Sequence, residues 1–85
     1  MTQLSDLPNI GKVVEAKLKE AGIETPEQLI RMGAEQAFIR LSTIDKTVCL
    51  SMLCGLEGAI RGIRWHQLPG KRKEELRAFY RITQR

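Results

Sequence analysis

Apolar side chains recur at helical spacing most persistently in the stretch Thr47–Trp65. The positions that share one face of a helix form a continuous stripe: Cys49, Met52, Leu53, Leu56, Ala59, Ile60 and Ile63. Three further apolar positions widen this stripe around its first half: Val48, Leu50 and Cys54. A helix that is apolar on nearly all sides is normally buried. The pattern therefore predicts a buried central helix over about residues 46–63.

Three glycines lie inside this predicted helix, at positions 55, 58 and 62. Each glycine costs a helix about 0.8–1 kcal/mol relative to alanine, so three of them need a local reason. Because Gly58 and Gly62 are four residues apart, they predict that a neighbouring helix packs close to the axis. The alternative is a merely weak helix. Glu57 precedes Arg61 by four residues, which is the favourable order for an ion pair on a helix.

Shorter periodic segments on both sides predict the other helices. The turn at Leu7-Pro8-Asn9-Ile10-Gly11-Lys12 leads into a helix over about Gly11–Ala21, with Gly22 at the C-cap. A short polar lead, residues 1–6, precedes it with at most one frayed turn. Thr25, Pro26 and Gln28 form an N-terminal capping pattern, which starts a helix at Pro26–Met32.

Two more helices complete the expected set. One runs over about Ala34–Leu41, after Gly33, and Asp45 is a plausible cap for the central helix. The other runs over about Lys71–Ile82, after the turn signal Pro69-Gly70. No stretch alternates with a period of two. We therefore expect one all-α domain over residues 1–85, a compact bundle of about five helices around the central one.

Composition narrows the functional class. Charges interrupt the apolar stretch well short of the roughly 18–20 residues of a membrane span, and no secretory signal precedes Leu4. Cys49 and Cys54 are expected to be reduced, buried thiols of a cytoplasmic protein. His66 is the only histidine, so no metal-ligand set is expected. We expect no catalytic residues, no cofactor and no small-molecule substrate, which leaves a small enzyme as a remote alternative.

The formal net charge of +4 is unevenly distributed. Residues 1–42 carry five basic and six acidic side chains, a net −1, whereas residues 43–85 carry nine and four, a net +5. A basic half favours an acidic partner such as nucleic acid, although solubility alone also explains such an excess.

Two groups of residues are candidates for contact with DNA phosphates. The first is the turn Asn9, Ile10, Gly11 and Lys12, where backbone N–H groups and a helix start could face a phosphate. The alternative is a turn that only starts a helix. The second group is basic, and a solvated helix face is its alternative meaning: Arg61, Arg64, Lys71, Arg72, Lys73, Arg77, Arg81 and Arg85. Of these, Arg61, Arg64, Lys71 and Arg72 are the predicted contacts. Trp65 is interpreted as a large side chain that fills the small core. The alternative is that it is an anchor for binding a partner.

Several segments together carry a family resemblance: Leu7–Gly11, Gly22–Leu29, Gly33-Ala34, Leu53, Leu56–Ala59, Trp65 and Leu68-Pro69. In their order and spacing they resemble the C-terminal domain of the TfoX/Sxy family of DNA-transformation competence regulators, from about Leu4 to Arg81. The resemblance implies a compact helical domain related to helix–hairpin–helix or SAM-like folds. It also implies a non-enzymatic regulatory role, with DNA or a transcription protein as partner. Regulators of this family carry an additional N-terminal domain, so we expect this chain to be a stand-alone copy of the C-terminal one.

Two functions from different classes follow. The first is a regulatory module that binds duplex DNA weakly and without sequence preference, linked to transcription or competence. The second is a protein-interaction domain, an adaptor or a homodimer, that does not contact DNA. The apolar breadth around Leu50 and Cys54 favours the second function, because a monomer of 85 residues would not fully cover it.

Overall fold

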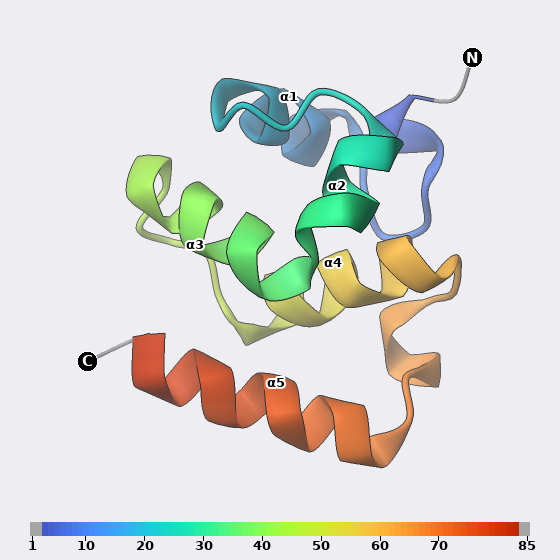
Figure 1. Cartoon of the computed structure of the whole chain (residues 1–85), viewed down its shortest axis with the longest axis vertical. Coiled ribbons are helices and arrows are strands. Elements are labelled where there is room, and N and C mark those ends of the chain that lie inside the picture. The colour runs from blue at the N-terminus through green and yellow to red at the C-terminus, as the bar shows by residue number, and fades with distance from the viewer. Residues whose placement is uncertain (1–2, 84–85) are drawn as a thin grey trace.

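Five α-helices and two 3₁₀ turns make up the computed structural model, which describes residues 3–83 (Figure 1). In chain order these are the 3₁₀ turn η1 (Leu4–Asp6), α1 (Lys12–Glu20), α2 (Pro26–Met32), α3 (Ala34–Ile44), α4 (Leu50–Arg61), the 3₁₀ turn η2 (Trp65–Gln67) and α5 (Gly70–Thr83). No strand occurs between residues 3 and 83. The predicted all-α bundle of about five helices is confirmed. Its finer description as a helix–hairpin–helix fold is not confirmed.

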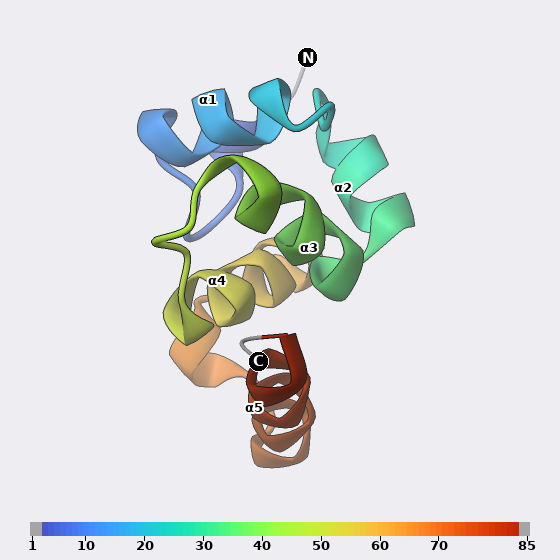
Figure 2. The same ribbon diagram turned by 90° about the vertical axis from the view of Figure 1, so that its left-hand side faces the viewer.

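Helix α4 lies at the centre of the bundle. It packs against α2, α3, α5 and η2, with α3 on one side and α5 on the other. Figure 2 shows the resulting layers, with α1 and α2 beyond α3 and with α5 at the opposite edge. The inward side of α4 contributes Leu53, Leu56 and Ala59 to the core. The prediction of a buried central helix is therefore confirmed.

The central helix is shorter than predicted at both ends. It begins at Leu50 because Cys49 is extended and forms the N-cap. Asp45 does not cap it: this residue is the C-cap of α3, and its carboxylate accepts the Thr47 N–H at 2.9 Å. The helix ends at Arg61 because Gly62 takes a left-handed conformation with φ +76°. Gly62 is thus a terminator, and no atom approaches the position of a Cβ there within 4 Å.

The close approach predicted at Gly58 occurs, but no helix makes it. A Cβ on Gly58 would lie 2.6 Å from Asn9 Nδ2, 2.7 Å from the Ile63 carbonyl oxygen and 3.2 Å from Trp65 Cα. The neighbours are therefore the turn before α1 and the loop after α4. The predicted helix contact at Gly58 is wrong, because the chain that reverses after Gly62 occupies that space.

The capping signals in the first half are confirmed. Thr25 Oγ1 accepts the Gln28 N–H at 3.1 Å, and Gln28 Oε1 accepts the Glu24 N–H at 2.6 Å. Gly22 follows the C-cap of α1 with φ +89°. Helices α3 and α5 are longer than predicted, since α3 continues to Ile44 and α5 to Thr83. Residues 1 and 2 of the predicted polar lead lie outside the described part.

Three expectations about burial are wrong. Leu4, in the predicted polar lead, is fully buried in the core. Cys49 is exposed, because it precedes the helix instead of lying on its inner face, whereas Cys54 is buried as expected. Trp65 is 41% exposed and does not fill the core. On the broad apolar side of α4, Cys54 is buried, whereas Leu50 is half-buried and packs against the core.

Candidate binding surface around Trp65

The side chain of Asn9 fastens the turn before α1 to the loop after α4. Asn9 Nδ2 donates to the Ile63 carbonyl at 3.0 Å and to the Gly55 carbonyl at 3.3 Å, and Asn9 Oδ1 accepts the Trp65 N–H at 3.3 Å. Asn9 is the one non-glycine residue with positive φ among residues 3–83, at +69°. Asparagine tolerates this conformation better than most residues. The turn therefore has a structural role that uses every polar atom of the Asn9 amide.

This fastening fixes the backbone that carries Trp65. Gly62 reverses the chain direction, and the Ile63 N–H then donates to the Gly58 carbonyl at 2.9 Å. Because Gly58 has no side chain, the backbone after Gly62 can pack directly against it. Trp65 nevertheless remains 41% exposed. Its ring packs edge-on against His66, with 5.3 Å between ring centroids. The loop after α4 thus holds a large aromatic side chain at the surface on a rigid support.

Trp65 lies at the rim of a cleft of about 450 Å³. The loop between α3 and α4, the first turns of α4, the Asn9 turn and the loop after α4 form its walls. Its lining residues come from these four segments and, for Lys17, from α1: Asn9, Lys17, Asp45, Thr47, Val48, Cys49, Ser51, Met52, Gly55, Arg64 and Trp65. Asn9 and Trp65, which are 56 positions apart in sequence, meet there because the Asn9 side chain is hydrogen-bonded to the backbone at Gly55, Ile63 and Trp65.

One of the two cations in the cleft is already paired. Lys17 donates to Asp45, which also accepts the Thr47 backbone N–H and hydroxyl, and these hydrogen bonds, that from Lys17 above all, hold the pKa of Asp45 well below its usual range. Arg64 is exposed and forms no ion pair with any residue between 3 and 83. Arg64 is therefore the cation of the cleft that remains able to bind an anion.

Cys49 lies in the same cleft, at the start of α4. Its Sγ lies 3.0 Å from Ser51 Oγ, and this contact, with the N–H groups of Met52 and Ser51, lowers the pKa of the thiol. The pKa of the Cys54 thiol is raised instead, chiefly by burial. The two thiols, five residues apart, thus differ in both accessibility and acidity.

The structure gives most of the predicted phosphate-binding residues structural roles. Asn9 holds the loop after α4, Ile10 is buried in the core and Gly11 is the N-cap of α1. Gly11 and Lys12 are the exposed members of the turn, and Lys12 Nζ lies 3.4 Å from Gln3 Oε1 and 3.9 Å from Glu15 Oε1. Of the four predicted residues, these two are accessible to a phosphate.

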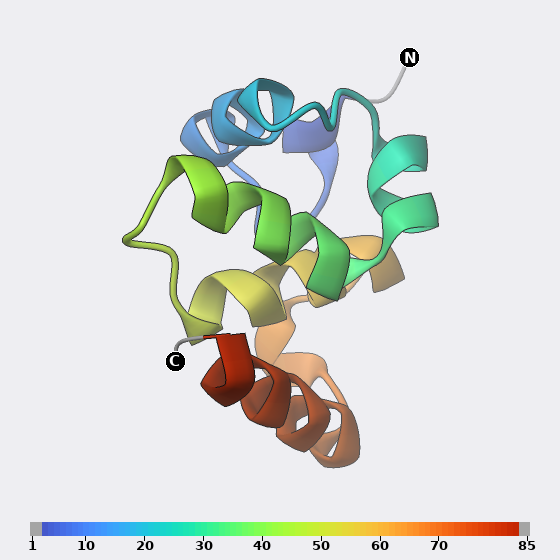
Figure 3. The same ribbon diagram turned by 60° about the vertical axis from the view of Figure 1, so that its left-hand side comes forward.

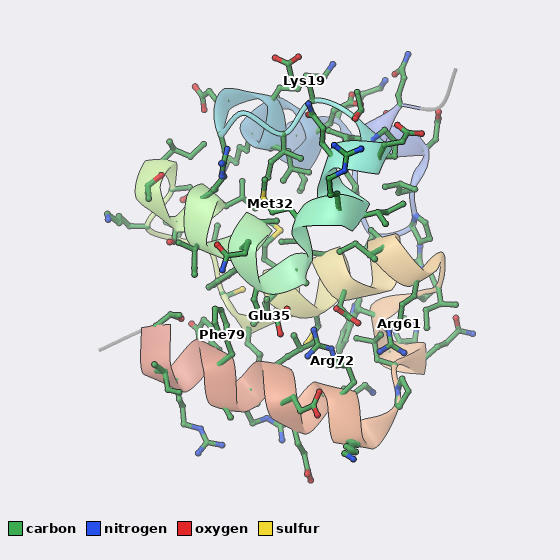
Figure 4. The ribbon with its side chains drawn as sticks, in the orientation of Figure 1. Lys19, Met32, Glu35, Arg61, Arg72 and Phe79 are labelled. Atoms are coloured by element: carbon green, nitrogen blue, oxygen red, sulfur yellow. The ribbon has the colours of Figure 1, made fainter. Side chains whose placement is uncertain are left out.

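An ion network centred on the buried Glu57 holds two of the predicted basic residues. Arg72 Nη2 donates to Glu57 at 3.0 Å and to Glu35 at 2.9 Å, and Arg72 Nη1 donates to Glu75 at 3.2 Å. Arg61 Nε donates to Glu57 at 2.7 Å, which confirms the predicted pair. Figure 4 shows Arg72 reaching from α5 into the bundle toward Glu35. Arg72 joins α5 to α3 and α4.

The network keeps Glu57 ionised although it is only 7% exposed. Burial by itself would raise the pKa of Glu57, but the hydrogen bonds from Arg72 and Arg61 outweigh it and lower that pKa. The pKa of Arg72 is raised, first by its hydrogen bond to Glu57. These charges stabilise the packing of α5 and leave Arg72 unable to bind a phosphate without giving up its carboxylates.

The predicted residues do not form one surface. Asn9 and Arg64 meet at the cleft, whereas Lys71 and Arg72 belong to α5, which lies across α4 from α1 (Figure 1, Figure 3). Arg64 and Lys71 are exposed. Arg85, the last of the basic set, lies outside the described residues.

Sequence reasoning missed the cleft itself. Its walls include Val48, Cys49 and Met52, which the apolar pattern assigned to the buried stripe of the central helix. One signal could have revealed it. Gly62 is typical of a helix end, and a tryptophan three residues beyond a helix end need not be buried.

Within residues 3–83, no group of three or more His, Cys, Asp or Glu side chains could hold a metal ion. None of the described helices has the length and apolar character needed to cross a membrane.

The profile of the TfoX C-terminal domain family matches residues 1–80. The chain belongs to this family. It is also 40% identical over 74 residues to Protein Sxy of Escherichia coli K12, a match that covers 87% of the chain and 35% of Sxy. The chain thus corresponds to about a third of the length of that relative.

Two crystal structures share this fold of the TfoX C-terminal domain. An uncharacterized protein from Listeria monocytogenes in a triclinic form has a TM-score of 0.96 at 48% identity, covering 98% of this chain and 94% of that one. A protein of unknown function from the same organism, in a tetragonal form, has a TM-score of 0.91 at 50% identity, covering 94% and 98%. The resemblance to the TfoX/Sxy family drawn from the sequence is confirmed.

Proposed function

We propose that this chain is a non-enzymatic regulatory domain that works in the cytoplasm, in the control of DNA-transformation competence, and that it acts by binding a protein partner. Membership of the TfoX C-terminal domain family and the similarity to Sxy support the regulatory role. The chain matches 35% of Sxy, so its role in competence is proposed from similarity to one part of that protein.

The observation that carries the proposal is the exposed Trp65 on its rigid support. Two hydrogen bonds that Asn9 donates, one that it accepts from the Trp65 N–H and the close approach at Gly58 fix the backbone beneath it, yet 41% of Trp65 remains accessible. Tryptophan is enriched among the residues that dominate binding at protein interfaces. A support that is already ordered also lowers the entropic cost of binding. The surface therefore has the properties of a preformed protein contact.

The experiment replaces the chromosomal copy in the source bacterium with Trp65→Ala. We expect transcripts of competence genes to fall about tenfold, since losing an interface anchor typically costs more than about 1.4 kcal/mol. The matched control is Val13→Ala, which removes a 71% exposed apolar side chain of α1 outside the cleft. Both variants should accumulate to wild-type levels. Equal transcript levels in the two variants would show that Trp65 has no regulatory role.

A second candidate function, weak binding to duplex DNA, is favoured by the exposed cations Arg64 and Lys71 and by the net +5 of residues 43–85. Contacts to phosphates alone predict Kd values of about 10⁻⁴–10⁻⁶ M near physiological salt, with little sequence preference. Lys12 and Arg61 would add to the contact where the backbone of the DNA reaches them.

A titration of duplex DNA at two salt concentrations tests this second function. Arg64→Ala and Lys71→Ala should each lower the salt slope by about one, for every sequence alike, and Lys12→Ala should do so if the turn before α1 contacts DNA. Arg31→Ala, in the N-terminal half, is the control. Arg72→Ala is unsuitable here because it breaks the ion network that holds α5. Absence of binding at low salt would exclude this function.

A further inference from the structure

We infer that the Trp65 cleft binds an acidic segment of a partner protein, with a large apolar side chain seated beside Trp65 and a carboxylate paired with Arg64. The inference rests on the proposed function, since it names the chemistry of the partner in the same cleft.

The apolar part of the cleft provides the seat. Val48 is 7% exposed, Met52 is half-buried and Trp65 is 41% exposed, so an open aromatic rim borders a lower apolar floor. Trp, Met and Arg are enriched at protein interfaces relative to the remaining surface. A volume of about 450 Å³ is within the usual range for a binding pocket and accommodates one or two large side chains.

The charges of the cleft determine the sign of its partner. Its lining contains two cations, Lys17 and Arg64, and one anion, Asp45. The Lys17–Asp45 pair is internally neutral, and Asp45 is only 14% exposed. The charge that faces an incoming ligand is therefore the guanidinium of Arg64. A carboxylate fits the planar fork of a guanidinium through two parallel hydrogen bonds.

The same lining favours a peptide over a nucleic acid. Binding to a phosphate backbone requires a series of cations along the track of the strand. The cleft offers one unpaired cation beside Val48, Met52 and Trp65. One cation beside three apolar side chains suits a short peptide. The anchor side chain of the peptide supplies most of the affinity, and a single carboxylate sets its orientation.

Trp65 also provides the measurement, because it is the only tryptophan of the chain. Its fluorescence therefore reports on this cleft alone. The probes are a synthetic peptide Asp-Glu-Leu-Phe-Asp-Glu and its counterpart with lysine at all four acidic positions. A short single-stranded oligothymidylate is the nucleic-acid probe. We expect the acidic peptide to shift the emission of Trp65 to shorter wavelength in a saturable manner, and the lysine peptide and oligothymidylate to leave it unchanged.

Variants then assign the contacts, with binding followed by the anisotropy of a fluorescein-labelled acidic peptide. Arg64→Gln should weaken binding about fivefold to tenfold, as expected for loss of one charge-assisted contact. Trp65→Ala should weaken it more than about tenfold. Two variants of α5 are the controls. Arg77→Gln removes an equal charge, and Ile82→Ala removes a 67% exposed apolar side chain. Each should change the affinity less than about twofold.

Each outcome decides between the claims. Saturation by the oligothymidylate but not by the acidic peptide would overturn the inference in favour of a nucleic acid. A mass near twice 9.7 kDa that Trp65→Ala halves, without peptide binding, would overturn it in favour of a second copy of the chain. If Trp65→Ala lowers competence transcripts but neither peptide binds, the inference fails and the proposed function stands. If the acidic peptide binds but the transcripts are unaffected, the proposed function fails and the chemistry of the cleft stands.

Discussion

Gly58→Ala tests how closely the loop after α4 lies on that helix. The added methyl carbon would lie 2.6 Å from Asn9 Nδ2 and 2.7 Å from the Ile63 carbonyl oxygen. The Asn9 amide is held by three hydrogen bonds, and the Ile63 N–H is bonded to the Gly58 carbonyl at 2.9 Å, so neither neighbour retreats without losing contacts. Overpacking of this kind costs about 1–3 kcal/mol, and a lost hydrogen bond about 1 kcal/mol more.

The gain in helix propensity, about 1 kcal/mol, offsets part of this cost. We expect the free energy of unfolding to fall by about 1–3 kcal/mol, which lowers the Tm by about 5–20 °C in a domain of this size. Urea or thermal denaturation followed by circular dichroism measures it. The emission of Trp65 should also change, because the loop that carries it must move.

Gly55→Ala is the matched control within the same helix. A Cβ there meets only Asn9 Cβ, at an ordinary 3.5 Å, so the gain in helix propensity should leave the Tm equal to or above that of the wild type. The loss caused by Gly58→Ala should also be smaller in an Asn9→Ala background, where one of the clashing atoms is absent. A Tm for Gly58→Ala that matches or exceeds the wild type, or that shifts as for Gly55→Ala, would refute the reasoning.

Four further predictions concern the ion network, the thiols and the metal content. Arg72→Ala should lower the free energy of unfolding, measured by urea denaturation, by about 1–3 kcal/mol. This loss is smaller than that from breaking a fully buried ion pair, because Arg61 still contacts Glu57. The control Arg77→Ala should have little effect. The pKa of Glu57 is lowered in the folded state, so the ionised carboxylate contributes its full stabilisation above the ordinary pKa of 4.5 and loses it as the pH falls below that value. Glu57→Gln should therefore lose less stability than the wild type in that acidic range. An equal loss in both proteins would contradict the network. Iodoacetamide should alkylate Cys49 in the native protein and Cys54 only after unfolding, as mass spectrometry of the peptides would show, and the purified protein should contain no stoichiometric zinc.

The helices and their order could be predicted from the sequence because their determinants are local. Apolar spacing, the Thr25 cap and the glycine after α1 act within a few residues of each other, and the structure confirms all of them. The Glu57–Arg61 pair is equally local, since four residues on a helix bring the two side chains together. The family resemblance also depended on the order and spacing of residues, and the comparisons confirm it.

The candidate site could not be predicted, because it depends on contacts across 46 to 56 residues of sequence. Asn9 looked like a turn residue available to a phosphate, and its role became clear only when the fold placed Gly55, Ile63 and Trp65 around it. Arg72 looked like part of a solvated basic face, yet α3 and α4 bring Glu35 and Glu57 to it.

The sequence by itself thus determined which segments are helical and which face of α4 is buried, since hydrophobic periodicity and capping are properties of neighbouring residues. The tertiary structure decided where α4 ends, which charges neutralise one another and which aromatic ring stays outside. Trp65 is exposed because Gly62 reverses the chain and the Asn9 amide then holds the returning backbone against Gly58. Gly62 is a local signal, whereas the bond to Asn9 joins residues 56 positions apart and exists only in the folded chain.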